Sequence, residues 1–431
     1  MRTRGGRRFL SGASVVAAGV VFAACSTGVV GGQSGAGAAT SSTTPGVTST
    51  SVKVAVVASQ TSIIGYTTFG PFITGEKAYF SMVNAQGGVN GRKITLAWNY
   101  TTGLTDSKFT SLIHQVVDAD HAFAVGISSY NFTPAYLKQT GIPTYGWNVV
   151  GNWTGPKNLF ASGGSVQFYT ALPPQVAYLM QKTKTSTVGI LALNVGASAA
   201  ACTNAAKKLP KYGVKVGYEN LKVTVKALAT TVQRMRSKGV NFVLSCMETT
   251  NNITLSSDLQ RYGVKATQYW LDGGTVQLYK KYPSQTTGVY IRTTSVPFTL
   301  PPKVAKYYPG LKKYLTSMKK YPKYKTSQTA LNGWASAALL VAGLKAAGKN
   351  PTQQGVVQAT NKLSFDATGM QTVTHWTVAH TKAPPPYCTA FVQVQKSKLV
   401  TKFMRGHQVF TCFTLKNTTP VKAAPGTPGT T

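Results

Sequence analysis

Hydrophobic and polar positions near the start of the chain predict a strand–helix–strand unit. Residues 52–58 form a Val-rich run that is apolar except at Lys53, which is typical of a parallel strand buried on both faces. A helical stripe begins near Pro71 and ends at Gly87, because glycine adopts the left-handed C-cap conformation at little cost. Residues 93–98 then alternate as a second strand. The loop 59–68 therefore follows the carboxyl end of a strand, where ligands bind in open α/β sheets.

Strand-like and helix-like segments continue to alternate after this unit, as a parallel sheet requires. One series runs to Tyr145 and a second series of similar size runs from Val166 to Leu271. Further helices are predicted near 303–319, 327–347 and 352–361. The stretch from 51 to 415, about 365 residues, exceeds one usual hydrophobic core, so two lobes are expected. The predicted fold class is α/β.

The run Asn-Ala-Gln-Gly-Gly-Val-Asn-Gly-Arg at 84–92 carries a family resemblance when it follows such a unit. With the Val-rich strand, the polar loop and Gly75 near the helix start, it resembles the opening of type I periplasmic binding proteins. The similar group is the leucine/isoleucine/valine-binding family that serves ABC transporters. The helix at 330–348 resembles a late helix of that family, although a generic buried helix explains its composition equally well.

The resemblance implies two doubly wound parallel-sheet lobes joined by a three-segment hinge, with the ligand in the cleft between them. On that pattern, lobe one covers about 52–160 and 293–372. Lobe two covers about 161–292 and 373–415. Residues 416–431 are rich in Pro, Thr and Gly, and we predict a disordered tail there.

The N-terminus resembles a bacterial lipoprotein signal peptide over residues 1–25. Basic residues precede the apolar stretch 15–24, and small residues precede Cys25, which in such signals is lipidated and becomes the mature N-terminus. An ordinary signal peptide that is cut elsewhere and removes Cys25 is the alternative. Residues 26–50 are Gly, Ser, Thr and Ala with one Pro, which predicts a flexible linker. We expect an extracytoplasmic protein that is lipid-anchored to the outer face of the bacterial cell membrane.

Four cysteines remain after Cys25, and an exported protein can form disulfides. We predict a Cys202–Cys246 pair, because each follows an apolar strand and neighbouring parallel strands would bring their carboxyl ends together. We also predict a Cys388–Cys412 pair, because the flanking segments look like two arms of a hairpin. Three pairings are possible, and four buried thiols are the alternative.

The chain has 45 Lys and Arg residues against nine Asp and Glu residues, which gives a formal net charge of +36. Such a charge is typical of nucleic-acid binding, but the export signal and the lack of a basic–aromatic recognition motif argue against a nucleic-acid partner. Two interpretations stay open. One is attraction to anionic cell-wall polymers or lipid headgroups. The other is life at low external pH, where a fold with few ionised carboxylates loses little on protonation.

Signatures of catalysis are weak in this sequence. The five histidines are scattered without the spacing of a zinc motif. The chain has no Gly-x-Ser-x-Gly elbow and no Walker-type phosphate loop. We therefore expect no catalytic residue, no metal and no cofactor.

Binding chemistry is better represented. Ser128, Ser129 and Tyr130 follow a predicted strand and precede a helix, whose free N–H groups and two serine hydroxyls would hold an anion. The resemblance places ligand-carboxylate contacts in this loop and in the next one, near Tyr145 and Trp147. Helix capping by these residues without a ligand is the alternative.

Aromatic and acidic residues complete the predicted site. Tyr66, together with the aromatic residues of the two loops above, would line an apolar cleft that suits a small ligand, although such residues also simply pack between lobes. The resemblance implies an acid on lobe two for a ligand ammonium group. Asp272 is the nearest match and Glu248 is the second. The lobe-two aromatic residue of the family has no clear equivalent near 194–198.

These observations predict a solute-binding protein that captures an amino acid, an amide or a related compound and delivers it to the membrane permease of an ABC importer. We expect a monomer. A ligand-sensing receptor of the same fold is one alternative, and a secreted cell-wall hydrolase is another.

Overall fold

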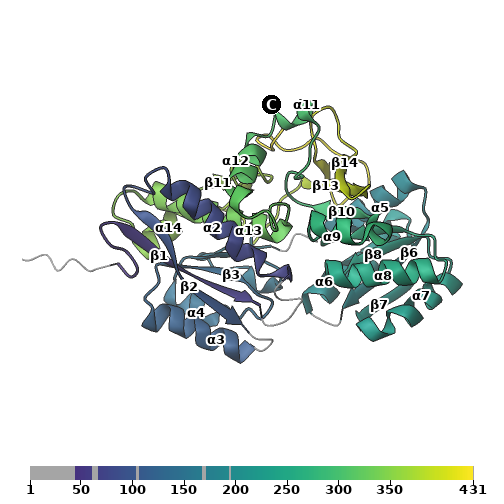
Figure 1. The fold of residues 1–431 in the computed structure, drawn as a ribbon, viewed down its shortest axis with the longest axis horizontal. Helices are drawn as coiled ribbons and strands as arrows, with labels where there is room; N and C mark the ends of the chain where they lie inside the picture. The colour runs from purple at the N-terminus through teal and green to yellow at the C-terminus, as the bar shows by residue number, and fades with distance from the viewer. Residues whose placement is uncertain (1–43, 61–66, 103–105, 167–170, 194–195, 431) are drawn as a thin grey trace, which may run out of the picture. The chain divides into compact units, whose positions relative to one another are not determined.

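A computed structural model describes residues 44–60, 67–102, 106–166, 171–193 and 196–430. The predicted signal peptide, Cys25 and Tyr66 lie outside the described residues. Two parallel-stranded sheets form the centre of the described part, and helices flank both (Figure 1). The α/β fold class with two lobes is confirmed.

The first sheet has the strand order β2-β1-β3-β4-β5, and all of its pairs are parallel. This order reverses direction between β1 and β3, and such a switch point is where α/β sheets bind ligands. The apolar residues of the run at 52–58 are buried within β1, as its composition predicts, whereas Lys53 is exposed. The strands are β1 (Ser51–Ser59), β2 (Lys93–Thr102), β3 (Ala124–Ser128), β4 (Thr144–Gly146) and β5 (Leu159–Ala161).

Two helices pack closely on one face of this sheet, α2 (Pro71–Asn84) and α13 (Gln328–Ala347). A Cβ atom on Gly75 would overlap the Ala330 carbonyl oxygen, and one on Gly333 would overlap the Phe72 carbonyl oxygen. Glycine at both positions therefore allows the two backbones to touch. The other helices of this lobe are α3 (Asp106–His114), α4 (Ala135–Thr140), α11 (Pro302–Ala305), α12 (Pro309–Ser317) and α14 (Gln353–Thr360).

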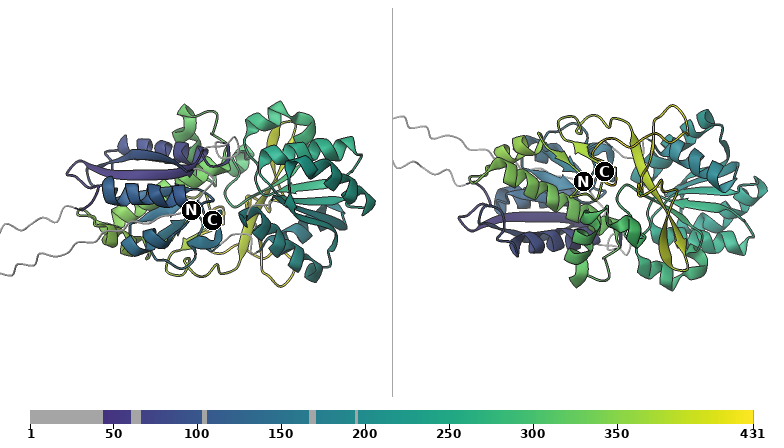
Figure 2. Two further views of the ribbon diagram at one scale, coloured as in Figure 1. Left: turned by 90° about the horizontal axis from the view of Figure 1, so that it is seen from below. Right: turned by 90° about the horizontal axis from the view of Figure 1, so that it is seen from above.

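The second sheet has the order β14-β13-β10-β9-β8-β6-β7. Its strands from β7 to β10 are parallel, whereas β13 runs antiparallel to β10 and pairs with β14 at the edge. Figure 2 shows these two late strands in yellow beside the teal sheet. The strands are β6 (Thr187–Leu193), β7 (Lys215–Val223), β8 (Phe242–Cys246), β9 (Thr267–Trp270), β10 (Tyr290–Thr293), β13 (Tyr387–Gln395) and β14 (Lys398–Lys402).

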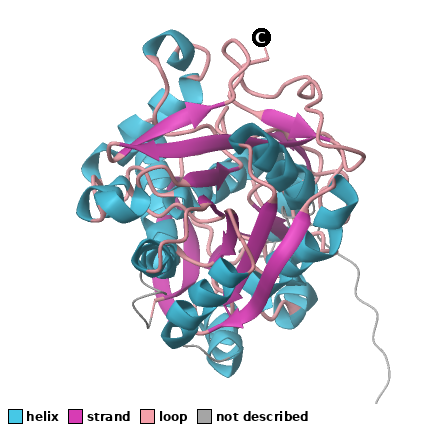
Figure 3. Cartoon of the chain, turned by 90° about the vertical axis from the view of Figure 1, so that its right-hand side faces the viewer, coloured by secondary structure: helices cyan, strands magenta, loops and turns pink. Residues whose placement is uncertain are grey.

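Helices flank the strands of the second sheet, as Figure 3 shows with strands in magenta and helices in cyan. The alternation of strand and helix follows the sequence prediction from Thr187 onward. Side chains of the helices and strands pack together in apolar clusters against the sheet. The helices are α5 (Leu172–Thr183), α6 (Gly196–Lys208), α7 (Leu228–Ser237), α8 (Thr249–Arg261), α9 (Val276–Lys281) and α10 (Pro283–Thr286).

The chain passes between the two sheets three times. It leaves the first sheet after β5, returns after β10 to form α12 and α13, and crosses again before β13. The first and third crossings lie side by side, because the Ser165 N–H donates to the Ala379 carbonyl at 3.0 Å. Three crossings agree with the three-segment hinge that the resemblance implies.

Both predicted disulfides are present. Cys202 on α6 bonds Cys246 at the end of β8, and β6 and β8 are neighbouring parallel strands as expected. Cys388 on β13 bonds Cys412 on β15 (Thr411–Phe413), directly opposite in an antiparallel pair. The hairpin partner of β13 is β14, however, so these two segments are not consecutive arms of one hairpin.

Three segments differ from the sequence expectation. The strand β5 was not expected. The helix predicted at 303–319 is divided into α11 and α12, because Pro309 restricts Tyr308 to a non-helical conformation and then starts a new helix. The tail at 416–430, expected to be disordered, has a defined place, and its Val421 N–H donates to the Cys412 carbonyl at 2.8 Å.

The helix α13 is long and apolar enough by composition to cross a membrane, but 78% of its apolar window is buried inside the protein. Its residues pack against α2 and belong to the core of the first lobe. The helix is therefore a core helix, in agreement with the buried helix that its composition predicts.

Candidate functional site

The loop after β3 brings the two predicted serines to the carboxyl edge of the first sheet. Ser128 and Ser129 are fully buried. The Ser128 hydroxyl donates to the Phe69 carbonyl at 3.3 Å. The Ser129 hydroxyl hydrogen bonds with Ser59 at 2.8 Å and with Thr102 at 3.4 Å. We call Ser59, Thr102 and Ser129 the hydroxyl cluster, and its members hydrogen bond with one another.

The helix that was expected directly after this loop starts later than predicted. Its first residue is Ala135, and Pro134 is its N-cap without a side-chain cap. The Ser129 hydroxyl instead accepts from the Asn131 N–H at 3.1 Å, which shapes the loop locally. The two serines therefore hold the loop together, and free N–H groups of a helix start do not lie beside them.

Aromatic side chains gather at the same edge of the sheet. The ring of Phe69 lies 4.8 Å from that of Tyr130 in an edge-on arrangement and 5.6 Å from that of Trp147. Tyr130 and Trp147 are both partly exposed. The sequence analysis placed both residues in the binding cleft, and the structure brings them together around Phe69.

Tyr145 lies elsewhere. It is 2% exposed, its ring stacks on Phe160 at 5.1 Å, and its hydroxyl hydrogen bonds with Thr360 at 3.2 Å. Burial raises the pKa of Tyr145 well above its ordinary value. Successive strand residues face opposite sides of a sheet, and Tyr145 faces the core beneath α13 and α14. This placement leaves it little surface for a ligand.

The two acids predicted for a ligand ammonium group lie close to each other on the second lobe. Glu248 is the N-cap of α8, and its carboxylate accepts from the Thr250 and Asn251 N–H groups at 2.6 and 2.8 Å. Asp272 follows β9 and accepts from the N–H groups of Thr249 and Gly274 at 3.3 and 3.2 Å.

Electrostatics link these acids to the aromatic group of the first lobe. Burial raises the pKa of Glu248, and the nearby charge of Asp272 raises it further, although two backbone hydrogen bonds oppose this. The pKa of Tyr130 is raised by burial first and then by the charge of Glu248. The charge of Glu248 on lobe two therefore acts on Tyr130 of lobe one, and we call the space between these two side chains the cleft.

A cavity of about 270 Å³ lies next to this cleft, where the three crossings meet. Two predicted residues, Trp147 and Asp272, line it. It also receives side chains from the first crossing at 162–166 and the third at 371–388. We call it the hinge cavity. The other described residues that were predicted to bind the ligand do not belong to its lining: Ser128, Ser129, Tyr130, Tyr145 and Glu248.

Three residues that the sequence analysis did not select provide polar groups to the hinge cavity: Gln175 of α5, Arg292 of β10 and Gln328 of α13. The Arg292 Nε–H donates to Gln175 Oε1 at 2.9 Å. Burial lowers the pKa of Arg292. An arginine within a buried strand and a glutamine within an apolar helix are rare, and that rarity is the signal in the sequence that could have identified them.

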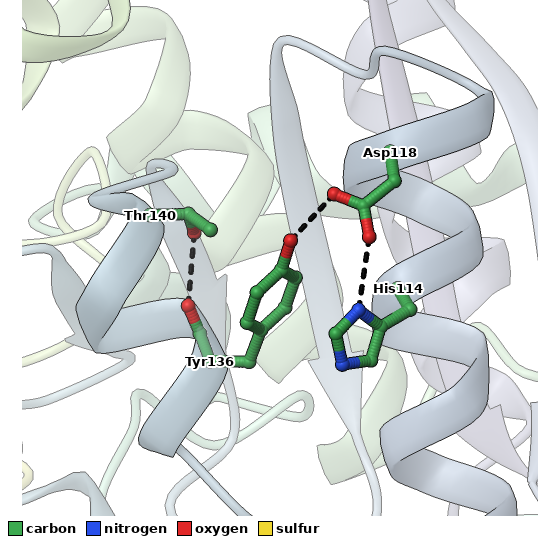
Figure 4. A network of polar contacts seen from close by, with 4 residues as sticks. All are labelled: His114, Asp118, Tyr136 and Thr140. Atoms are coloured by element: carbon green, nitrogen blue, oxygen red, sulfur yellow. Dashed lines mark hydrogen bonds and ion pairs between the residues drawn. The ribbon is translucent and has the colours of Figure 1, made fainter. Parts of the chain in front are cut away.

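A separate network lies on the surface of the first lobe (Figure 4). The His114 ring donates to Asp118 at 2.9 Å and stacks on Tyr136 of α4, whose hydroxyl also donates to Asp118. The hydrogen bond from Tyr136, followed by that from His114, lowers the pKa of Asp118. The contact between His114 and Asp118 has the geometry of an ion pair. The network ties α3 and η1 (Gln115–Ala119) to α4.

Within the described part of the chain, no group of three His, Cys, Asp or Glu side chains is placed to hold a metal ion. The polar groups of the cleft and the hinge cavity are hydrogen-bond donors and acceptors in a partly apolar surrounding. Such sites bind small organic molecules.

The comparisons with known proteins agree with this architecture. The model of the periplasmic binding protein family matches residues 51–398. No curated protein matches the chain. Among solved structures, a fatty acid ABC transporter substrate-binding protein from Thermomonospora curvata has a TM-score of 0.71 at 19% identity. The alignment covers 86% of this chain and 95% of that one.

Two further solved structures share the fold. A branched-chain amino acid ABC transporter protein from Thermus thermophilus with bound valine has a TM-score of 0.69 at 15% identity, covering 82% of this chain and 95% of that one. A solute-binding protein from R. palustris in complex with benzoate has a TM-score of 0.65 at 14% identity, covering 88% and 100%. The family match spans most of the chain, and the chain belongs to the periplasmic binding protein family, whose members are extracytoplasmic solute-binding proteins.

Proposed function

We propose that this protein captures a small organic acid or amino acid between its two lobes and delivers it to the membrane permease of an ABC importer. The observation that carries the proposal is the hinge cavity. It lies at the carboxyl ends of strands in both sheets, since Trp147 follows β4 and Asp272 follows β9. Ligands of open α/β sheets bind at this edge.

The ligands of the solved neighbours support a carboxylate-bearing solute. Their names mention a fatty acid, valine and benzoate. These molecules differ in shape and polarity, but each has a carboxylate. The class of solute is therefore better supported than any single compound.

Four predicted residues are proposed to contact the solute in the cleft. Tyr130 and Trp147 offer aromatic surface from lobe one, and Glu248 and Asp272 offer carboxylates from lobe two. An ammonium group on the solute would pair with these carboxylates. Ser128 and Ser129 remain the sequence-based candidates for the solute carboxylate, although both hydroxyls hydrogen bond within the protein.

A screen of solutes tests the proposal. Thermal shift would be measured with amino acids, their amides, aromatic acids, fatty acids and short peptides, and each hit would be confirmed by calorimetry. A ligand that binds only the folded protein raises the melting temperature by mass action. We expect a hit that is bound without being chemically changed. Turnover of the hit would instead favour an enzyme, and uptake of labelled solute by cells distinguishes import from sensing.

We also propose that Cys25 is lipidated and holds a monomeric protein at the outer face of the membrane. The motif before Cys25 supports this. Stable attachment needs more than one acyl chain, so Cys25→Ala is expected to release the protein into the soluble fraction. Absence of labelled palmitate from the wild-type protein would refute the anchor without affecting the solute-binding proposal.

A further inference from the structure

The hinge cavity collects polar side chains that lie far apart in the sequence. Gln175, Arg292 and Gln328 come from α5, β10 and the first turn of α13. Gln175 and Arg292 are 1% and 6% exposed. Burying a polar side chain costs free energy unless the side chain is hydrogen bonded. The hydrogen-bond partners of these residues therefore decide whether the site is complete.

Both glutamine amides have one satisfied end and one unsatisfied end. The Gln175 oxygen accepts from the Arg292 Nε–H, which fixes the amide so that Nε2 is the other end. The Gln328 oxygen accepts from the hydroxyls of Thr293 and Ser295 at 2.8 and 3.0 Å. Nε2 of each glutamine is buried and has no hydrogen-bond partner. Two amide donors are therefore left over in the lining of one cavity.

The charges of the cavity lining favour an anion. Arg292 and Lys382 are its positively charged residues, and Asp272 is its negatively charged residue. The Asp272 carboxylate already accepts hydrogen bonds from Thr249 and Gly274. Surplus donors beside a guanidinium suit an acceptor with two oxygens and a negative charge, because charge-assisted hydrogen bonds are the strong ones.

We propose that the hinge cavity binds the carboxylate of the solute, with Gln175 and Gln328 as donors and Arg292 as the cation. The inference deepens the proposed function and rests on it. The remainder of the solute then extends past Trp147 toward the cleft, where Tyr130 and Glu248 lie. The orientation is the opposite of the one that the serine loop predicts.

Matched carboxylate and amide probes test this inference. Binding of benzoate and benzamide, octanoate and octanamide, and valine and valinamide would be measured by calorimetry on the mature protein. We expect at least one carboxylate to bind about tenfold or more tightly than its amide. The matched amide keeps the shape and removes the charge, so the difference reports the anion site.

Two substitutions on different elements then locate the site. Gln175→Glu and Gln328→Glu each replace a donor with a carboxylate, and each is expected to weaken binding of the carboxylate probe about tenfold or more. Gln86→Glu makes the same charge change at an exposed turn and serves as the control. If either Glu variant fails to fold, the corresponding Gln→Leu variant removes the donor without adding a buried charge.

The outcomes separate the inference from the proposed function. If both glutamine variants bind the solute as tightly as the wild type does, the hinge cavity is not the carboxylate site, although the protein still binds the solute. Water would then be the partner of the two buried amide nitrogens. Equal binding of carboxylates and amides, or binding of only neutral or cationic solutes from the wider screen, would overturn the hinge site likewise. Binding of no solute of any class would refute the proposed function as well.

Discussion

The hydroxyl cluster and the hinge cavity are both polar, and both lie at the carboxyl edge of a sheet, but their polar groups are used differently. In the hydroxyl cluster, Ser129 hydrogen bonds with Ser59, Thr102 and the Asn131 backbone. In the hinge cavity, the amide nitrogens of Gln175 and Gln328 are buried without a partner. The first set is complete without a ligand, and the second set is not.

Folded proteins pair nearly all of their buried polar groups. A complete network rigidifies the fold around it, whereas surplus donors in a cavity indicate a group that arrives later. The contrast therefore supports a structural role for the hydroxyl cluster and the binding role that we propose for the hinge cavity. The sequence alone favoured the reverse assignment, because the serine loop follows a strand in a recognisable motif.

The largest expected effect is on Arg292. Arg292→Met is expected to weaken binding of a carboxylate solute by about 2–5 kcal/mol, the scale for loss of one partner of a buried charge pair. Stability is expected to fall by about 1–3 kcal/mol, because the buried Gln175 oxygen loses its hydrogen-bond donor. Calorimetry measures the first quantity and thermal melting measures the second.

The same variant can break the comparison. If Arg292→Met binds the solute as tightly as the wild type does, the hinge cavity is not the carboxylate site. A fall in melting temperature with unchanged affinity would show that Arg292 only joins β10 to α5 through Gln175.

Ser129→Ala is expected to have a smaller effect, and on a different quantity. It should lower the free energy of unfolding by about 1–3 kcal/mol, the cost of leaving buried hydrogen-bonding groups unpaired. Affinity for the solute should stay near that of the wild type, because the Ser129 hydroxyl is already used within the protein. Chemical denaturation and calorimetry separate the two quantities.

An opposite result would sharpen the comparison in favour of the sequence-based assignment. If Ser129→Ala weakens binding by about 1–2 kcal/mol while Gln175→Glu does not, the serine loop holds the carboxylate. Ser162→Ala is a useful companion, because the Ser162 hydroxyl lines the hinge cavity and has no partner.

Most of the fold was predictable from the sequence, since local patterns determine it. The Val-rich run and the Gly-Gly helix stop predicted the first unit, and β1 and α2 follow them. The disulfides were predictable, because a strand order that brings neighbouring ends together also brings Cys202 and Cys246 together. The break before Pro309 was missed, although the rule for residues before proline could have identified it.

The site was less predictable, because its residues meet only through the crossings. Arg292 and Gln175 are 117 residues apart, and no local pattern relates them. Trp147 and Asp272, which line the hinge cavity, were predictable because each lies just after a strand. Tyr145 was selected for the same reason, but a continuous apolar strand does not reveal which face a given side chain takes.

Glu76→Gln tests how a buried carboxyl group of lobe one makes the stability of the protein depend on pH. Glu76 on α2 is 2% exposed, its Oε2 has no partner, and its carboxylate lies against Gly126 of β3. Burial raises the pKa of Glu76 well above its ordinary value of 4.5. Its contribution to stability is therefore complete below pH 4.5 and is lost as the pH rises toward the folded-state pKa.

The amide of Glu76→Gln stays neutral at every pH, so this variant should melt above the wild type at pH 7 and close to it at pH 3. Equal pH profiles for the two proteins would show that Glu76 does not contribute. The effect should be smaller than that at Arg292, because the substitution preserves the shape of the side chain.

The smallest expected effect concerns His380 near the hinge cavity, where a fall in pH lowers stability instead of raising it. His380 is fully buried beside Ala379, which lines the hinge cavity, and its Nε2 hydrogen bonds with Asn361 at 2.8 Å. Burial, followed by the charge of Lys157, lowers the pKa of His380 from 6.5 to about 4. A histidine that is buried neutral contributes stability above pH 6.5 and loses it as the pH falls toward 4.

His380→Gln removes this titration and can keep a hydrogen bond to Asn361. We expect the wild-type melting temperature to fall between pH 6.5 and 4 by more than that of the variant, with the pH response of the two proteins nearly equal at pH 7 and above. As the pH falls, protonation of His380 lowers the melting temperature, whereas protonation of Glu76 raises it. Comparing the double variant with each single variant therefore separates the two contributions. A wild-type profile that His380→Gln does not flatten would assign the acid response to groups outside the third crossing.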